Sequence, residues 1–140
     1  MKKLLVHFSV IALLAGCSTN AITGRKQLAL FPESSLQQEA LTQYQAFLSQ
    51  NKVVSQGTNK DAEMVKRVGT RIAQAITAYY GQKGQSQELE GYKWEFNLVD
   101  NKEINAWCMP GGKVVVYAGL LPVTQDETSL AIVMGHEIAH

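Results

Sequence analysis

The last five residues of the chain, His136-Glu137-Ile138-Ala139-His140, place two histidines four positions apart. On an α-helix, residues four apart lie on one face, about 6 Å apart along the axis. Two imidazoles in this arrangement can bind one tetrahedral zinc ion at about 2.0–2.1 Å each. Glu137 lies beside the first histidine, where it can take a proton from water at the metal and return it to a leaving amine. The pattern predicts a zinc helix with His136 and His140 as ligands and Glu137 as the catalytic acid–base.

The context of the motif separates this hypothesis from its alternative, two surface histidines on an amphipathic helix. The motif follows a long apolar run, Leu130 to Met134, which would bury the helix in a core. Burial supplies the low dielectric in which a metal polarises a carbonyl effectively. The other histidine, His7, lies in a segment that we expect to be removed. We therefore favour the metal site.

The N-terminus has the features of a secretion signal. Lys2 and Lys3 precede a short apolar stretch, Leu4 to Leu14, which is well below the ~20 residues needed to span a bilayer. The sequence that follows, Leu14-Ala15-Gly16-Cys17, resembles a bacterial lipobox, in which the cysteine receives a lipid and becomes the new N-terminus. The alternative is an ordinary signal peptide with Cys17 as a bystander. The lipobox interpretation predicts lipidation of Cys17 and attachment to a membrane.

Charge and cysteine content exclude some classes of function. The chain has 13 Lys+Arg against 12 Asp+Glu in 140 residues, with no basic run, which argues against a nucleic-acid partner. If Cys17 carries a lipid, Cys108 has no partner for a disulfide within this chain. Cys108 then has two interpretations, an extra zinc ligand that holds an enzyme latent or a small buried apolar side chain.

The apolar pattern predicts three helices and two strands. Helical spacing predicts helices from Ser35 to about residue 49, from Asp61 to Tyr80, and from Thr124 to the end, with capping boxes at Ser35 and Thr124. Alternation predicts a strand over Tyr92–Val99, and a valine-rich run predicts a second over Lys113–Tyr117. This order predicts an α+β fold. We expect a signal peptide over residues 1–16, a polar tether over 17–33 and a single domain over 34–140.

A tight turn, Pro110-Gly111-Gly112, leads into the second strand just before the zinc helix. One interpretation is an exposed sheet edge that binds a substrate peptide as an added strand. The other is a plain structural hairpin. Under the first, the substrate-binding residues are Gly112, Lys113, Val114, Val115, Val116 and Tyr117.

These features together resemble a known family. The run Asn105–Leu121, the pair Asp126-Glu127 and the segment Gly135–His140 are similar to the HtpX and CAAX-prenyl-protease family of gluzincin metallopeptidases. Two earlier stretches look like its periplasmic lipoprotein branch: Thr23–Leu28, and the helix with Val65, Arg67, Val68 and Gly69. The resemblance implies a zincin-like domain with one zinc ion per subunit, held by His136, His140 and a glutamate on a later helix.

That third ligand has no counterpart here, and the resemblance does not assign it to Glu103, Asp126 or Glu127. The sequence ends at His140, so we expect a fragment of a longer protein rather than a dead remnant. The 140 residues alone should bind zinc weakly and lack activity, because catalytic zinc sites use three protein ligands.

The resemblance implies a zinc metalloendopeptidase of the bacterial envelope that degrades misfolded or misassembled envelope proteins. Its partners would be peptide or protein substrates and, through the lipid, the outer membrane facing the periplasm. Ser18, after the lipidated cysteine, is typical of outer-membrane sorting. A rival hypothesis is a non-catalytic, chaperone-like lipoprotein that binds unfolded proteins through the hairpin edge.

Overall fold

The computed structural model of the protein describes residues 17–19, 26–28 and 31–140. The chain divides into two units, Met1–Ser35 and Leu36–His140. In the first unit, β1 (Cys17–Thr19) pairs antiparallel with β2 (Lys26–Leu28). The predicted signal peptide, residues 1–16, lies outside the described residues. In the part of the chain that is described, no helix has both the length and the apolar character needed to cross a membrane.

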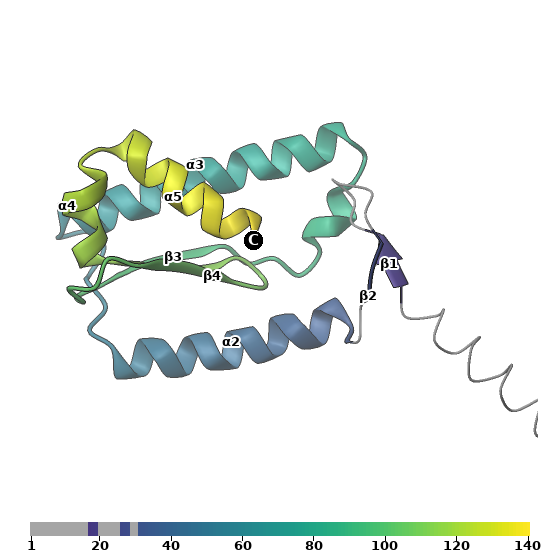
Figure 1. The fold of residues 1–140 in the computed structure, drawn as a ribbon, viewed down its shortest axis with the longest axis horizontal. Helices are drawn as coiled ribbons and strands as arrows, with labels where there is room; N and C mark the ends of the chain where they lie inside the picture. The colour runs from purple at the N-terminus through teal and green to yellow at the C-terminus, as the bar shows by residue number, and fades with distance from the viewer. Residues whose placement is uncertain (1–16, 20–25, 29–30) are drawn as a thin grey trace, which may run out of the picture. The chain divides into compact units, whose positions relative to one another are not determined.

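The second unit contains the candidate site and confirms the predicted α+β class (Figure 1). Its elements, in chain order, are α2 (Glu33–Gln50, which begins in the first unit), α3 (Lys60–Gln82), the 3-10 turn η1 (Ser86–Leu89), β3 (Glu95–Val99), β4 (Ala106–Met109), β5 (Lys113–Tyr117), the 3-10 turn η2 (Ala118–Leu120), α4 (Leu121–Thr124) and α5 (Glu127–Ala139).

The three strands form a mixed sheet in the order β3-β5-β4. β5 lies in the centre, parallel to β3 and antiparallel to β4. All five of its residues are buried. The Lys113 side chain, in a residue only 4% exposed, donates hydrogen bonds to the Glu95 carboxylate and the Lys93 carbonyl. The ion pair helps to fix the register of β5 on β3, since a buried ammonium is costly without partners.

Helices cover both faces of this sheet (Figure 1). Val114 and Val116 of β5 pack on one side with α3 and α5, in a cluster that includes Leu130. Val115 packs on the other side with Tyr44 of α2. Consecutive strand residues point to opposite faces, so an unbroken run of valines can fill both cores. Burial raises the pKa of Tyr44 to about 12, and its hydroxyl accepts a hydrogen bond from Asn97 at 2.6 Å.

Both predicted capping boxes are wrong. Helix α2 begins at Glu33, directly after Pro32, and the main-chain N–H of Ser35 already donates to the Pro32 carbonyl. Thr124 ends the short helix α4, with its hydroxyl bonded to the Leu121 carbonyl. The cap of α5 is Asp126, whose side chain accepts the N–H of Ser129 at 2.7 Å. A capping box needs an extended cap residue, and both predicted caps lie inside helices.

The predicted strands were partly correct. Lys113–Tyr117 has the predicted bounds. The predicted strand Tyr92–Val99 begins only at Glu95. Residues Ala106–Met109, for which we predicted no strand, form β4. The hairpin interpretation of the Pro-Gly-Gly turn already implied this strand, because a hairpin has a strand on each side of its turn.

Gly69 lets α3 lie directly against β3. A Cβ added at this position would overlap the ring of Phe96. We expect Gly69→Ala to lower the free energy of unfolding by about 1–3 kcal/mol, because overpacking a filled core outweighs the gain in helix propensity. Urea unfolding measures the change. The control is Gly81→Ala in the same helix, where a new Cβ meets only an ordinary contact with Ser86. Equal stability of the two variants would contradict this account of the helix–strand contact.

Candidate metal centre

The position of α5 in the core orients the predicted metal ligands. Its buried residues are Leu130 and Met134, which pack in the cluster shared with α3 and the sheet. At its first turn, the Glu127 carboxylate pairs with the Arg67 guanidinium of α3. The helix is therefore held by Asp126 at its start, by the Arg67 pair beside it, and by an apolar stripe along its length.

His136 and His140 converge at the other end of the helix. Their Nε2 atoms lie 3.0 Å apart, and their ring planes meet at 79° with centroids 4.5 Å apart. Both residues are exposed. Two imidazole nitrogens on one tetrahedral zinc ion lie about 3.3–3.4 Å apart, given bonds of about 2.0–2.1 Å. The two rings therefore need only a small adjustment to share a zinc ion, and this donor set fits the metal.

Glu137 lies one residue after His136 and three residues before His140 on the same helix. It is half-buried, and α5 packs against β4. Burial first, and then the negative charge of Glu137, raise the pKa of the Cys108 thiol on β4 to about 11. The charge of the Glu137 carboxylate on α5 thus acts on a thiol of β4. The end of α5 thus presents two exposed imidazoles and one half-buried carboxylate.

Within the described residues, no group of three or more His, Cys, Asp or Glu side chains is arranged to hold a metal. Asp126 and Glu127, which we did not nominate as ligands, are engaged in the cap and in the Arg67 pair. Both lie at the start of α5, more than about 13 Å along the axis from His136. Among the described residues, His136 and His140 are therefore the two predicted ligands that lie together.

The structure corrects the predicted substrate edge. Gly112 to Tyr117 lead into and form β5, whose main chain is paired on both sides. The outer edge next to α5 belongs to β4 instead. The Tyr117 N–H donates to the Asn105 carbonyl, so alternate β4 residues face β5, and the N–H and C=O of Ala106 and Cys108 point outward. A peptide strand can therefore be added at Ala106 and Cys108.

The thiol of Cys108 gives a pH-dependent test of this geometry. With a pKa of about 11, the metal-free protein should react with iodoacetamide at pH 7 about 10²-fold more slowly than an ordinary thiol of pKa 9.0. The rate of alkylation should rise with pH and level off above about pH 11, where the thiol is ionised. Because a negative neighbour raises the pKa of a thiol, Glu137→Gln should lower it and speed alkylation at pH 7. An unchanged rate in that variant would mean that Glu137 does not face β4.

Comparison with known proteins gives one family. The profile of peptidase family M48 matches residues 59–140. The chain is 46% identical over 71 residues to the mitochondrial metalloendopeptidase OMA1 of Schizosaccharomyces pombe, which covers 51% of this chain and 19% of the relative. It is 32% identical over 121 residues to human mitochondrial metalloendopeptidase OMA1, covering 85% of this chain and 22% of the relative.

A bacterial relative also matches. The chain is 45% identical over 47 residues to the beta-barrel assembly-enhancing protease of Escherichia coli (strain K12), covering 34% of this chain and 10% of the relative. The matched region is thus about a tenth to a quarter of the length of these curated relatives.

Proposed function

The chain belongs to peptidase family M48, and on this basis we propose that it carries the metal helix of a zinc-dependent endopeptidase. The observation that supports the proposal is the convergence of the His136 and His140 Nε2 atoms at 3.0 Å, next to a half-buried Glu137. Zinc, when bound, supplies Lewis acidity toward a peptide carbonyl and toward water.

The histidines and the glutamate of this chain have separate roles in the proposed reaction. His136 and His140 would hold the metal, since their Nε2 atoms converge. The Glu137 carboxylate accepts a proton from the attacking water and passes it to the nitrogen of the leaving amine. Its half-buried position strengthens its electrostatic effect on the reacting groups, because a medium of lower dielectric screens charges less.

The edge of β4 orients the substrate in this proposal. An extended peptide pairs with the outward N–H and C=O groups of Ala106 and Cys108 and adds a fourth strand to the sheet. Main-chain pairing of this kind is insensitive to the side chains of the substrate. It suits an enzyme that cleaves many unfolded polypeptides, because unfolded chains can adopt the extended conformation that the edge requires.

We further propose that the protein is a lipoprotein of the bacterial envelope, in the periplasmic branch that the sequence resembles, and that it removes misfolded or misassembled envelope proteins. The lipobox-like Leu14–Cys17 supports the anchor. The Escherichia coli relative, named a beta-barrel assembly-enhancing protease, supports the envelope role. Other relatives are named as mitochondrial enzymes, so the presence of Cys17 after a short apolar segment is what favours the envelope.

Cys17→Ser tests the anchor. We expect the variant to fractionate as a soluble protein or an uncleaved precursor, since the proposed membrane attachment is through lipid on the Cys17 sulfur. Membrane fractionation and the mass of the mature N-terminus measure the outcome. The control is Cys108→Ser, which removes the other thiol and should leave fractionation unchanged. A fully processed Cys17→Ser protein that stays in the membrane would mean that the anchor lies elsewhere.

Cleavage of an unfolded polypeptide tests the activity itself. The full protein should cut reduced, unfolded casein, lose this activity in a chelator, and regain it when zinc is restored. Cleavage that continues with all metal removed would overturn the metalloendopeptidase assignment. Tight binding of casein without cleavage at any zinc concentration would favour the rival chaperone-like function.

A further inference from the structure

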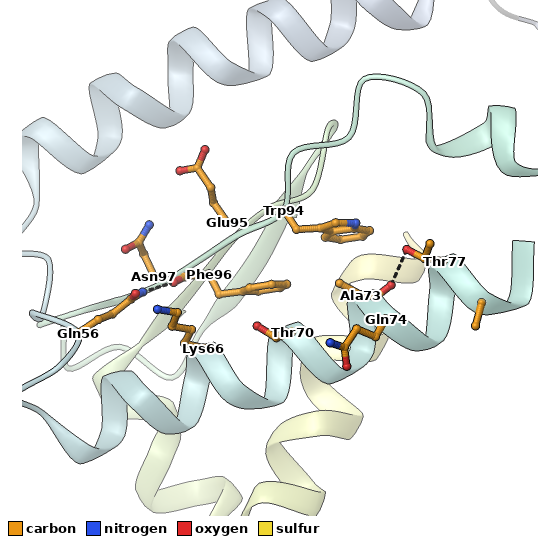
Figure 2. Close-up of a pocket in the computed structure, with 11 residues that line it drawn as sticks. Gln56, Lys66, Thr70, Ala73, Gln74, Thr77, Trp94, Glu95, Phe96 and Asn97 are labelled. Atoms are coloured by element: carbon orange, nitrogen blue, oxygen red, sulfur yellow. Dashed lines mark hydrogen bonds between the residues drawn. The ribbon is translucent and has the colours of Figure 1, made fainter. Parts of the chain in front are cut away.

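A groove of about 800 Å³ lies along the other edge of the sheet, between α3 and β3 (Figure 2). Thr70, Ala73 and Gln74 of α3 line one side, and Trp94 and Phe96 line the other. Lys66 lies at the end of the groove nearest Gln56 (Figure 2). The groove is on the edge opposite to β4, because β5 separates the two outer strands. The proposed catalytic machinery does not use it.

The main chain of β3 is only partly paired at this edge. Glu95 donates its N–H to Gly112, so the alternate residues Phe96 and Leu98 face outward. The Leu98 carbonyl accepts the Val54 N–H at 2.8 Å, next to an antiparallel bridge between Val53 and Val99. The chain thus pairs with the outer edge of β3 at Val53 and Val54 and then leaves it.

Beyond Val54, a side chain and not the main chain bonds to the outer edge of β3. The Phe96 carbonyl accepts the side-chain amide of Gln56 at 2.8 Å, a contact drawn in Figure 2. The Phe96 N–H points to the same side and has no acceptor among the residues that the structure describes. Unpaired main-chain groups on an edge strand are sites where another extended chain can pair.

The floor of the groove is aromatic. The rings of Trp94 and Phe96 are stacked, with planes 7° apart and centroids 6.1 Å apart. Phe96 is buried against Gly69, while Trp94 is only half-buried. An aromatic lining of this kind can pack against an apolar or aromatic side chain of a bound peptide.

The charge at the rim of the groove is positive. Lys66 is exposed and forms no ion pair within the described part of the chain. Glu95, the acidic residue of the lining, is already paired with the buried Lys113. Figure 2 shows the Glu95 side chain directed away from α3, whereas Lys66 extends from α3 toward Phe96. The charge that complements this groove is therefore negative.

We propose that the groove binds an extended segment of an unfolded polypeptide as an added antiparallel strand on β3. An apolar or aromatic side chain of the segment packs on Trp94 and Phe96, and an acidic side chain two residues away lies near Lys66. The inference goes beyond the proposed function and does not depend on cleavage. A single unfolded chain could then be held on β3 while another of its segments occupies the β4 edge.

The test is binding of a fluorescein-labelled heptapeptide, Ser-Val-Ser-Phe-Ser-Glu-Ser, to the full protein carrying Glu137→Gln, which prevents cleavage. Fluorescence anisotropy measures the affinity. Gln74→Trp fills the groove from the helix and should weaken binding by at least about tenfold. Lys66→Glu should weaken it about fivefold or more and should reverse the preference toward a peptide with lysine in place of glutamate. A matched control is Lys60→Glu, which makes the same charge change on α3 outside the groove.

Main-chain pairing has its own control, the same heptapeptide with an N-methyl group on phenylalanine, which should bind at least about tenfold more weakly. Circular dichroism confirms that each variant is folded. Unchanged affinity in both Gln74→Trp and Lys66→Glu would overturn the proposal, because the peptide would then be bound elsewhere, for example at β4. No binding of the heptapeptide at 1 mM, about the weakest affinity of practical interest, would also overturn it. Neither outcome bears on hydrolysis, which is measured separately in the wild-type protein.

Discussion

We expect Glu137→Gln to abolish nearly all peptide hydrolysis while leaving the bound zinc in place. The substitution keeps the size and polarity of the side chain but removes the proton acceptor. Loss of acid–base catalysis alone lowers the rate by about 10²–10⁴-fold, and the failure to activate water at the metal should lower it further. Zinc content should stay near that of the wild type, because the metal is assigned to the two histidines and not to this carboxylate.

Parallel measurements of zinc content and casein cleavage check the expectation in the full protein. The matched control is Glu127→Gln, the same change on the same helix, at a carboxylate that pairs with Arg67. An exposed ion pair of this kind contributes about 0–1 kcal/mol to the stability of the fold. The control should therefore stay folded and keep its activity. Wild-type cleavage by the Glu137→Gln protein with its zinc retained would refute the catalytic role of Glu137.

His136→Ala and His140→Ala should each lose both metal and activity. Removing one imidazole takes away a zinc bond and leaves the remaining ligand unable to hold the ion in a fixed geometry. Metal binding is also coupled to folding, so thermal unfolding should no longer respond to added zinc. This pattern differs from that of Glu137→Gln, in which the metal stays and only the chemistry fails.

The control for the histidine variants is Ile132→Ala. Ile132 lies four residues before His136 on the same helical face and is 69% exposed. Its truncation should leave zinc content unchanged, because it removes no ligand and little packing. If His136→Ala keeps one tightly bound zinc ion per chain, the histidine pair is not the metal site.

The convergence of His136 and His140 could be predicted from the sequence because its signal is local. Four-residue spacing on a helix fixes which side chains converge, and the apolar run from Leu130 to Met134 indicates that the helix packs in a core, where Leu130 and Met134 are buried. The structure brings His136 and His140 together as that spacing requires. The proximity of Glu137 to Cys108 could not be predicted, since it depends on how α5 packs on a strand far along the chain.

The edge of the sheet was predicted incorrectly for a similar reason. Strand order is a long-range property, and the pattern of Lys113–Tyr117 does not specify its neighbours. One local signal was present, because three consecutive valines at positions 114–116 are typical of a strand buried on both faces. Their burial could have been inferred, but the parallel pairing with β3 could not.

Of the two interpretations of Cys108, the structure favours the buried apolar side chain. The thiol packs with the cluster beneath α5, and its raised pKa disfavours the thiolate that binds metal. The main chain and the side chain of Cys108 therefore lie in different surroundings. The main chain is positioned to pair with a peptide, while the thiol packs in the core below.

The central place of β5 also determines how local stability is distributed through the sheet. Amide protons of Val114 to Val116 are bonded to a neighbouring strand on one side or the other and are shielded from water, so their exchange should require unfolding of the whole unit. The N–H groups of Ala106 and Cys108 face outward and should exchange through small local openings. The proposed substrate edge would thus be an easily opened strand anchored to the most protected one, so it could adapt to different peptides while β5 keeps the register of the sheet.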